Sequence, residues 1–136
     1  MSAGLTPHGP GFSFIDAFSV TEPGKAGRAA KRLDPELWFF RDHFPGNPLM
    51  PGVLLIESAA QAAGALWGAL QGETKKSYLL AQVEGFRLKR PVAPGAELTV
   101  EVVLEKDFGA LAKFRAEIFV DSAMVACGQV TLSAVP

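Results

Sequence analysis

The longest apolar segment of the chain runs from Met50 to Leu70 and is rich in Leu, Ile, Val, Ala and Trp, interrupted by Glu57, Ser58, Gln61, Gly64 and Gly68. A helix that is apolar on nearly every face has to be buried, so this segment predicts a helix that is surrounded by the rest of the domain. Pro51 suits the first helical turn, and Gly72 supplies a left-handed residue that can end the helix. A membrane span is disfavoured because Glu57 would lie deep in hydrocarbon and the flanks lack interfacial anchors. The pattern therefore favours the central helix of a soluble domain, without membrane insertion.

The second half of the chain has the pattern of β-strands. Three segments are rich in β-branched and aromatic residues: Glu97–Glu105, Leu111–Val120 and Met124–Ala134. In the middle segment charged residues alternate with apolar ones, which is typical of a strand with one buried face. Short turns at residues 107–109 and 121–123 predict two hairpins and an antiparallel meander. One long helix packed on such a sheet is an α+β fold.

The pattern in the first third of the chain predicts a lead-in segment followed by strands and turns. Residues 1–11 contain Pro and Gly and predict a flexible lead-in, so we expect no catalytic role for His8. Residues 21–25 form a Pro-Gly turn, and a short strand is expected over residues 26–33. Residues 34–36 predict another turn or a short helical start. We expect a single domain over residues 1–136.

Composition excludes several classes of partner. Apolar residues make up 49% of the 136 residues and charged residues 20%, and the net charge is -1, so nucleic acid and anionic membranes have no compositional support. A single cysteine, Cys127, excludes an internal disulfide and favours a reducing compartment. Because the first ten residues also lack a secretory pattern, the expected location is cytoplasmic. An open sheet leaves exposed edges, which favours dimerisation.

The residues that could carry chemistry cluster around the predicted start of the helix. The loop from His43 to Val53 contains three Pro and two Gly, and this rigidity suits a positioned base. Glu57 lies within the apolar helix, where desolvation would favour a protonated carboxyl that can donate a proton. Gln61 is one turn further along the same face, and the first amides of the helix, at Gly52 and Val53, could hold an oxyanion. A base, an acid and an oxyanion site suffice to eliminate water beside a carbonyl, without a metal or cofactor.

The motif His43-Phe-Pro-Gly-Asn-Pro-Leu-Met-Pro-Gly-Val-Leu-Leu-Ile-Glu57, followed by Ala60-Gln61, resembles the signature of FabZ-type 3-hydroxyacyl-acyl carrier protein dehydratases. The similarity extends through residues 87–95 and, more weakly, to residues 12–16 and 22–25. It departs from the family pattern at residues 41–42 and 82–85. The resemblance implies a hot-dog fold, with an antiparallel sheet wrapped around one long central helix.

By this resemblance, His43 removes the C2 proton of the acyl thioester and Glu57 protonates the departing C3 hydroxyl, while the Gly52 amide holds the thioester oxygen. The product is a trans-2-enoyl thioester made in fatty-acid or related polyketide or polyene synthesis. The family builds this site across a dimer interface. Glutamate at position 57 is similar to the dehydratase branch, whereas the dehydratase-isomerase branch carries aspartate.

The resemblance also implies a partner and a substrate channel. The acyl chain arrives on the phosphopantetheine arm of an acyl carrier protein, and the enzyme is a homodimer or a trimer of dimers. Candidate residues for docking the acidic carrier are Arg87, Lys89 and Arg90. Candidate lining residues for the acyl tunnel are Ile56, Ala60, Leu79 and Phe86.

Two other functions remain open from the sequence. A hot-dog hydrolase would use a carboxylate to activate water and release a free thiol from an acyl thioester. A non-catalytic subunit of a larger synthase would hold the acyl carrier without reacting. Conversion of a 3-hydroxyacyl thioester to the enoyl product distinguishes the dehydratase from both.

Overall fold

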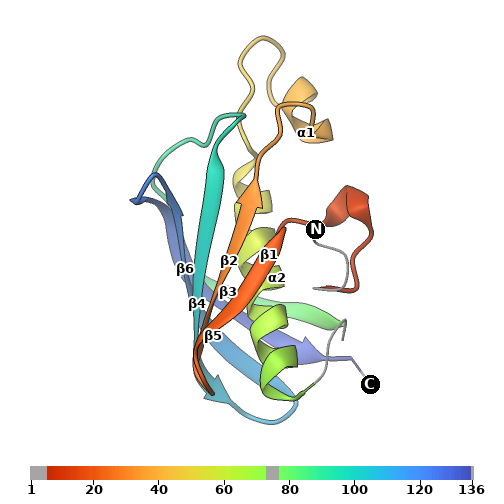
Figure 1. Ribbon diagram of the computed structural model, residues 1–136, viewed down its shortest axis with the longest axis vertical. Helices are drawn as coiled ribbons and strands as arrows, with labels where there is room; N and C mark the ends of the chain where they lie inside the picture. The colour runs from red at the N-terminus through yellow and green to blue at the C-terminus, as the bar shows by residue number, and fades with distance from the viewer. Residues whose placement is uncertain (1–5, 73–76, 136) are drawn as a thin grey trace.

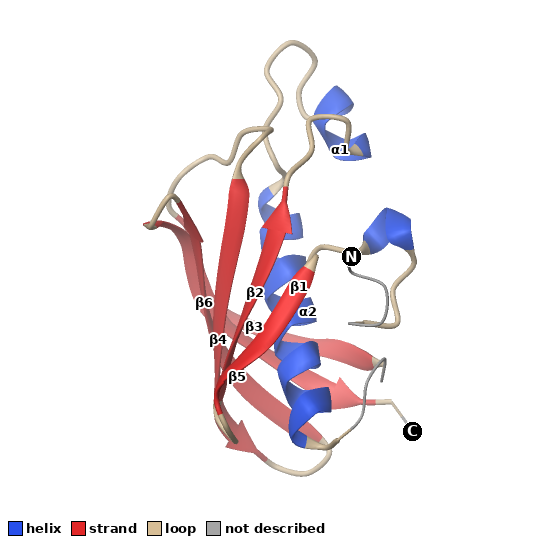
Figure 2. Cartoon of the chain, in the orientation of Figure 1, coloured by secondary structure: helices blue, strands red, loops and turns tan. Residues whose placement is uncertain are grey.

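A computed structural model describes residues 6–72 and 77–135. Figure 1 shows one curved sheet with one long helix, α2, lying along its concave side. The elements in chain order are η1 (Pro10–Phe12), β1 (Ala17–Glu22), β2 (Ala26–Arg32), α1 (Trp38–Asp42), α2 (Gly52–Leu70), β3 (Tyr78–Leu88), β4 (Glu97–Asp107), β5 (Leu111–Val120) and β6 (Ala123–Ala134). The α+β architecture predicted from the sequence is confirmed (Figure 2).

The six strands form an antiparallel sheet in the order β1-β2-β4-β5-β6-β3. The predicted meander is confirmed, because β4 pairs with β5 and β5 with β6. β5 has the predicted bounds, whereas β4 continues to Asp107 and β6 begins at Ala123. Asp107 is both the last residue of β4 and the start of the turn, since its carboxylate accepts a hydrogen bond from the Gly109 amide. β3 and β1 are the two edges of the sheet.

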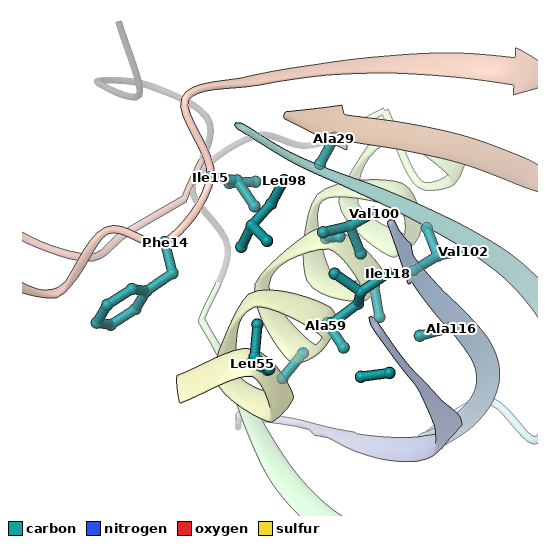
Figure 3. Packing of buried hydrophobic residues seen from close by; sticks show 14 of the residues in the cluster. Phe14, Ile15, Ala29, Leu55, Ala59, Leu98, Val100, Val102, Ala116 and Ile118 are labelled. Atoms are coloured by element: carbon teal, nitrogen blue, oxygen red, sulfur yellow. The ribbon is translucent and has the colours of Figure 1, made fainter. Parts of the chain in front are cut away.

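The core lies between α2 and the sheet. On β5, Phe114, Ala116 and Ile118 are fully buried, and the charged residues between them point to the other face. Figure 3 shows Leu55 and Ala59 of the helix packed among residues of β4 and β5. By length and composition α2 could span a membrane, but 61% of its most apolar 18-residue stretch is buried inside the domain. α2 is therefore the core helix, as the sequence predicts.

The helix begins at Gly52, where its first amide was expected, and Pro51 is its N-cap rather than a residue of the first turn. Two local effects explain this start. A residue before proline is disfavoured in helical conformation, so the helix does not extend back to Met50. The Met50 amide also donates to the carbonyl of Val92 instead of entering the helix. Gly72 has a φ of 70°, in agreement with its predicted left-handed role at the end of the helix.

The predicted turn before β2 is confirmed, since Lys25 N–H donates to the Glu22 carbonyl and Gly24 has a positive φ of 79°. The predicted turn at residues 34–36 also forms, and the short helix α1 follows it. The described part of the expected lead-in, residues 6–11, packs against the rest of the chain. Thr6 is buried, and the Trp38 indole N–H donates to the Gly11 carbonyl.

Candidate functional site

The loop between α1 and α2 is held by a ring of backbone hydrogen bonds. Phe44 and Asn47 exchange both of their N–H to carbonyl bonds, at 3.0 and 2.9 Å, and close a tight turn. Pro45 and Gly46 occupy the centre of this turn, where proline fixes φ and glycine adopts a φ of 76°. The Leu49 amide then donates to the His43 carbonyl at 2.7 Å. Backbone bonds therefore close the loop, predicted to be rigid from its Pro and Gly content, between His43 and Leu49.

The His43 side chain is fixed in one tautomer by this loop. Its Nδ1 lies 2.9 Å from the carbonyl oxygen of Leu49. Because a carbonyl oxygen can only accept, Nδ1 carries the hydrogen, and in the neutral ring the lone pair is on Nε2. The ring is partly buried and stacks on Phe44, with centroids 4.0 Å apart. In this tautomer Nε2 is the ring nitrogen that can accept a proton.

Glu57 lies in the second turn of α2 with its carboxyl partly exposed. Gln61 donates from Nε2 to Glu57 Oε2 at 2.9 Å, as expected from their spacing of one helical turn. The Gln61 side chain is buried and uses every polar atom, since Nε2 also donates to the Phe12 carbonyl and Oε1 accepts from the Phe14 amide. Gln61 thus fixes the carboxyl of Glu57 to the N-terminal segment of the chain.

The start of α2 carries two free amide groups beside a pocket. Gly52 and Val53 are the first helical residues, and neither amide has a hydrogen-bond partner within residues 6–72 and 77–135. A pocket of about 220 Å³ opens at this point. Its lining residues are Met50, Gly52, Leu55, Leu88, Lys89, Arg90, Pro91 and Val92. Two of the residues proposed for carrier docking, Lys89 and Arg90, therefore border the same pocket as the candidate oxyanion amide.

The candidate tunnel residues do not all lie together in the single chain. Ile56 and Ala60 are one turn apart on α2, and Phe86 is partly buried against Gly128 of β6. Leu79 lies near the opposite end of β3 and is 61% exposed. Arg87 is also exposed on β3 and is not among the residues that line the pocket.

His43 and Glu57 are not in contact within one chain. Among the described residues, His43 interacts through its side chain with Leu49 and Phe44, and Glu57 with Gln61 and His8. The predicted base and acid are therefore held by separate networks within one chain.

Sequence reasoning missed three features of this site. The Leu49 carbonyl orients His43, but a backbone atom leaves no signal in residue type. Leu88 covers Gly52 so closely that a Cβ added there would lie 2.3 Å from Leu88 Cδ1. His8, which we expected to have no catalytic role, lies 3.6 Å from the Glu57 carboxylate, from Nε2 to Oε2.

Comparison with known proteins finds relatives by sequence. The FabA-like domain family matches residues 6–129. The 3-hydroxyacyl-[acyl-carrier-protein] dehydratase FabZ of Klebsiella pneumoniae is 38% identical over 123 residues, which cover 89% of this chain and 82% of the relative. The FabZ of Salmonella arizonae has the same identity and coverage.

Solved structures share the fold at lower identity. The dehydratase heterocomplex ApeI:P from Xenorhabdus doucetiae matches with a TM-score of 0.81 at 16% identity, covering 97% of this chain and 89% of that chain. A hypothetical thioesterase from Streptococcus pneumoniae, solved with coenzyme A, matches with a TM-score of 0.67 at 9% identity, covering 89% and 88%. The resemblance predicted from the His43–Glu57 motif is confirmed: the chain has the hot-dog fold and belongs to the FabZ-type 3-hydroxyacyl-acyl carrier protein dehydratase family.

Proposed function

We propose that this protein dehydrates a (3R)-hydroxyacyl-acyl carrier protein to the trans-2-enoyl product, in fatty-acid or related polyketide or polyene synthesis in the cytoplasm. The observation that carries the proposal is the Nδ1–H bond from His43 to Leu49, which makes Nε2 the ring nitrogen available to act as the base. Glu57, held by Gln61, is the acid. Family membership at 38% identity supports the same reaction.

The reaction needs one proton removed and one supplied. His43 Nε2 takes the proton from C2, and the electron pair of that bond forms the C2–C3 double bond. The C3–O bond breaks, and the hydroxyl leaves as water with the proton of Glu57. The Gly52 amide donates to the thioester oxygen, on which negative charge develops as the C2 proton leaves, and Val53 offers a second N–H at the same helix start.

We further propose that the site is completed by a second copy of the chain. His43 and Glu57 have separate partners within one subunit, so each needs its counterpart from elsewhere. β3 is an edge of the sheet, and its exposed apolar residues are Leu79, Leu80, Val83 and Leu88. An edge strand of this length with apolar side chains favours pairing with another strand. A homodimer across β3 would cover these residues, including the tunnel candidate Leu79, and such dimers could assemble into a trimer of dimers.

The acyl carrier protein is the proposed partner. Apolar side chains such as Met50 and Leu55 line part of the pocket beside Gly52, and the exposed residues Lys89 and Arg90 border it. A neutral pantetheine arm can enter such a pocket while the basic side chains meet the acidic surface of the carrier. Arg87 extends this basic surface along β3.

The test measures the rise in enoyl absorbance when the protein is mixed with a 3-hydroxyacyl thioester. In the reverse direction, the absorbance of an enoyl thioester should fall. Glu57→Gln should lower turnover by roughly 10²- to 10⁴-fold, because it removes the proton donor but keeps an oxygen that can accept from Gln61. Glu36→Gln, at an exposed loop position, is the matched control and should keep wild-type activity. Free thiol without enoyl product would instead indicate a hydrolase. Carrier binding without either product would indicate a non-catalytic subunit, such as one member of a heterocomplex.

A further inference from the structure

Two side-chain nitrogen atoms lie close to a single oxygen of Glu57. Gln61 Nε2 lies 2.9 Å from Oε2, and His8 Nε2 lies 3.6 Å from the same atom. Oε1 has no polar partner from the protein within residues 6–72 and 77–135. The carboxyl is therefore asymmetric, with Oε2 engaged by the protein and Oε1 available to a substrate.

Gln61 has no further capacity to hold this carboxyl. One hydrogen of its amide goes to Glu57 and the other to the carbonyl of Phe12, while its oxygen accepts from the Phe14 amide. A side-chain amide offers two N–H groups, and both are used here. His8 is the other polar group near Oε2, with its Nε2 at 3.6 Å.

The segment that carries His8 is held in place by several contacts. Gln61 bonds it at Phe12 and Phe14, and the Trp38 indole N–H donates to the Gly11 carbonyl at 3.0 Å. The His8 ring lies beside that of Phe12, with centroids 6.1 Å apart. The buried Gln61 side chain therefore both orients Glu57 and anchors the segment that places His8 near Glu57.

We propose that His8 is a positioning residue for the dehydration, and the role rests on the proposed function. When Oε1 gives its proton to the leaving C3 hydroxyl, a carboxylate forms, and the His8 N–H stabilises that charge at Oε2. The separation of 3.6 Å is longer than a hydrogen bond, and contacts of this kind commonly shorten when substrate binds. His8 does not touch the reacting atoms and acts only through Glu57.

Two substitutions of His8 separate this role from packing. His8→Phe keeps an aromatic ring beside Phe12 but removes the N–H, whereas His8→Gln keeps a terminal N–H at a similar reach. Both are compared with wild type by kcat and KM for a 3-hydroxyacyl thioester and by melting temperature. His8→Phe should lower kcat by about tenfold, because it removes a hydrogen bond to a developing charge. KM should stay within about twofold, since the contact matters in the transition state and not in substrate binding.

The conservative variant decides between positioning and structure. His8→Gln should recover most of the lost kcat, and both variants should melt near the wild-type temperature. The inference is overturned if His8→Phe keeps wild-type kcat, if His8→Gln is equally impaired, or if the loss follows a drop in melting temperature. A wild-type protein that forms no enoyl product contradicts the dehydratase proposal itself, and the role of His8 with it.

Discussion

The Nδ1–H of His43 donates to the carbonyl oxygen of Leu49 at 2.9 Å, and the Leu49 amide returns a bond to the His43 carbonyl. This exchange ties the imidazole to the far end of its own loop. The proposed base is thereby positioned by a backbone turn that exists before any substrate arrives, which lowers the entropy lost on reaching the reactive geometry.

His43→Asn tests the base while keeping this anchor. The asparagine amide places a nitrogen close to the position of Nδ1 and can still donate to Leu49, but it has nothing at the position of Nε2. Turnover should fall by roughly 10²- to 10⁴-fold, the usual loss for a general base. The melting temperature should change little, because the loop bond is retained. Steady-state kinetics and thermal melts provide the measurement, and wild-type turnover in His43→Asn would remove His43 from the role of base.

Mixing two inactive variants tests whether the site is shared between subunits. Dimers of His43→Asn alone or of Glu57→Gln alone should have no intact site. In a mixed dimer, however, one site combines the native His43 of one subunit with the native Glu57 of the other. Random exchange should therefore restore about a quarter of wild-type activity, since half of the dimers are mixed and each has one of two sites.

The control for this experiment is the double variant His43→Asn/Glu57→Gln mixed with either single variant, in which no pairing of subunits produces an intact site. Subunit exchange is verified by mass spectrometry of differently tagged chains. Mixed dimers without activity would place both residues of each working site on one subunit.

Two substitutions at Gly52 distinguish the role of its backbone N–H from the steric effect of an added side chain. Proline is favoured at the first helical position, and Pro51 already has the extended conformation that must precede proline. Gly52→Pro thus deletes the candidate oxyanion donor with the helix intact. Gly52→Ala keeps the N–H and adds the same Cβ, which meets the flexible, half-exposed side chain of Leu88.

We expect kcat to fall by roughly 10²-fold in Gly52→Pro relative to Gly52→Ala, the typical loss for one oxyanion donor. Comparing the two variants cancels the effect of displacing Leu88. Circular dichroism checks that α2 is retained in both. Equal kcat values for the two variants would exclude the Gly52 amide from the reaction.

Local patterns predicted the elements that have a clear periodicity or composition. α2 and the β4–β6 meander follow from a continuous apolar run and from alternation such as that around Phe114. β3 has no such alternation, because an edge strand exposes most of its residues, and its place beside β6 depends on long-range pairing. α1 is only five residues long, too short for a helical period to be recognised.

The site residues also fall into two groups, those that the sequence predicted and those that depend on contacts between distant segments. His43, Glu57, Gln61 and Gly52 lie within one short segment, so their motif is visible in the sequence. The contact of His8 with Glu57 joins segments far apart in the chain, and a Gly- and Pro-rich stretch gives no sign that it folds back onto α2. The Leu49 carbonyl acts through the backbone, whose position depends on the turn at Gly46.

The buried amide of Gln61 should contribute measurably to stability. Gln61→Leu has a similar size but leaves the Phe14 amide and the Phe12 carbonyl without their partners, and Phe14 is only 2% exposed. A buried donor without a partner costs about 1–3 kcal/mol, so the free energy of unfolding should fall by about 2 kcal/mol. Gln71→Leu is the matched control, since its side chain accepts one exposed hydrogen bond from Tyr78, and it should change stability by less than about 0.5 kcal/mol. Urea unfolding of both variants makes the comparison, and equal stability in the two would mean that Gln61 does not anchor the N-terminal segment to α2.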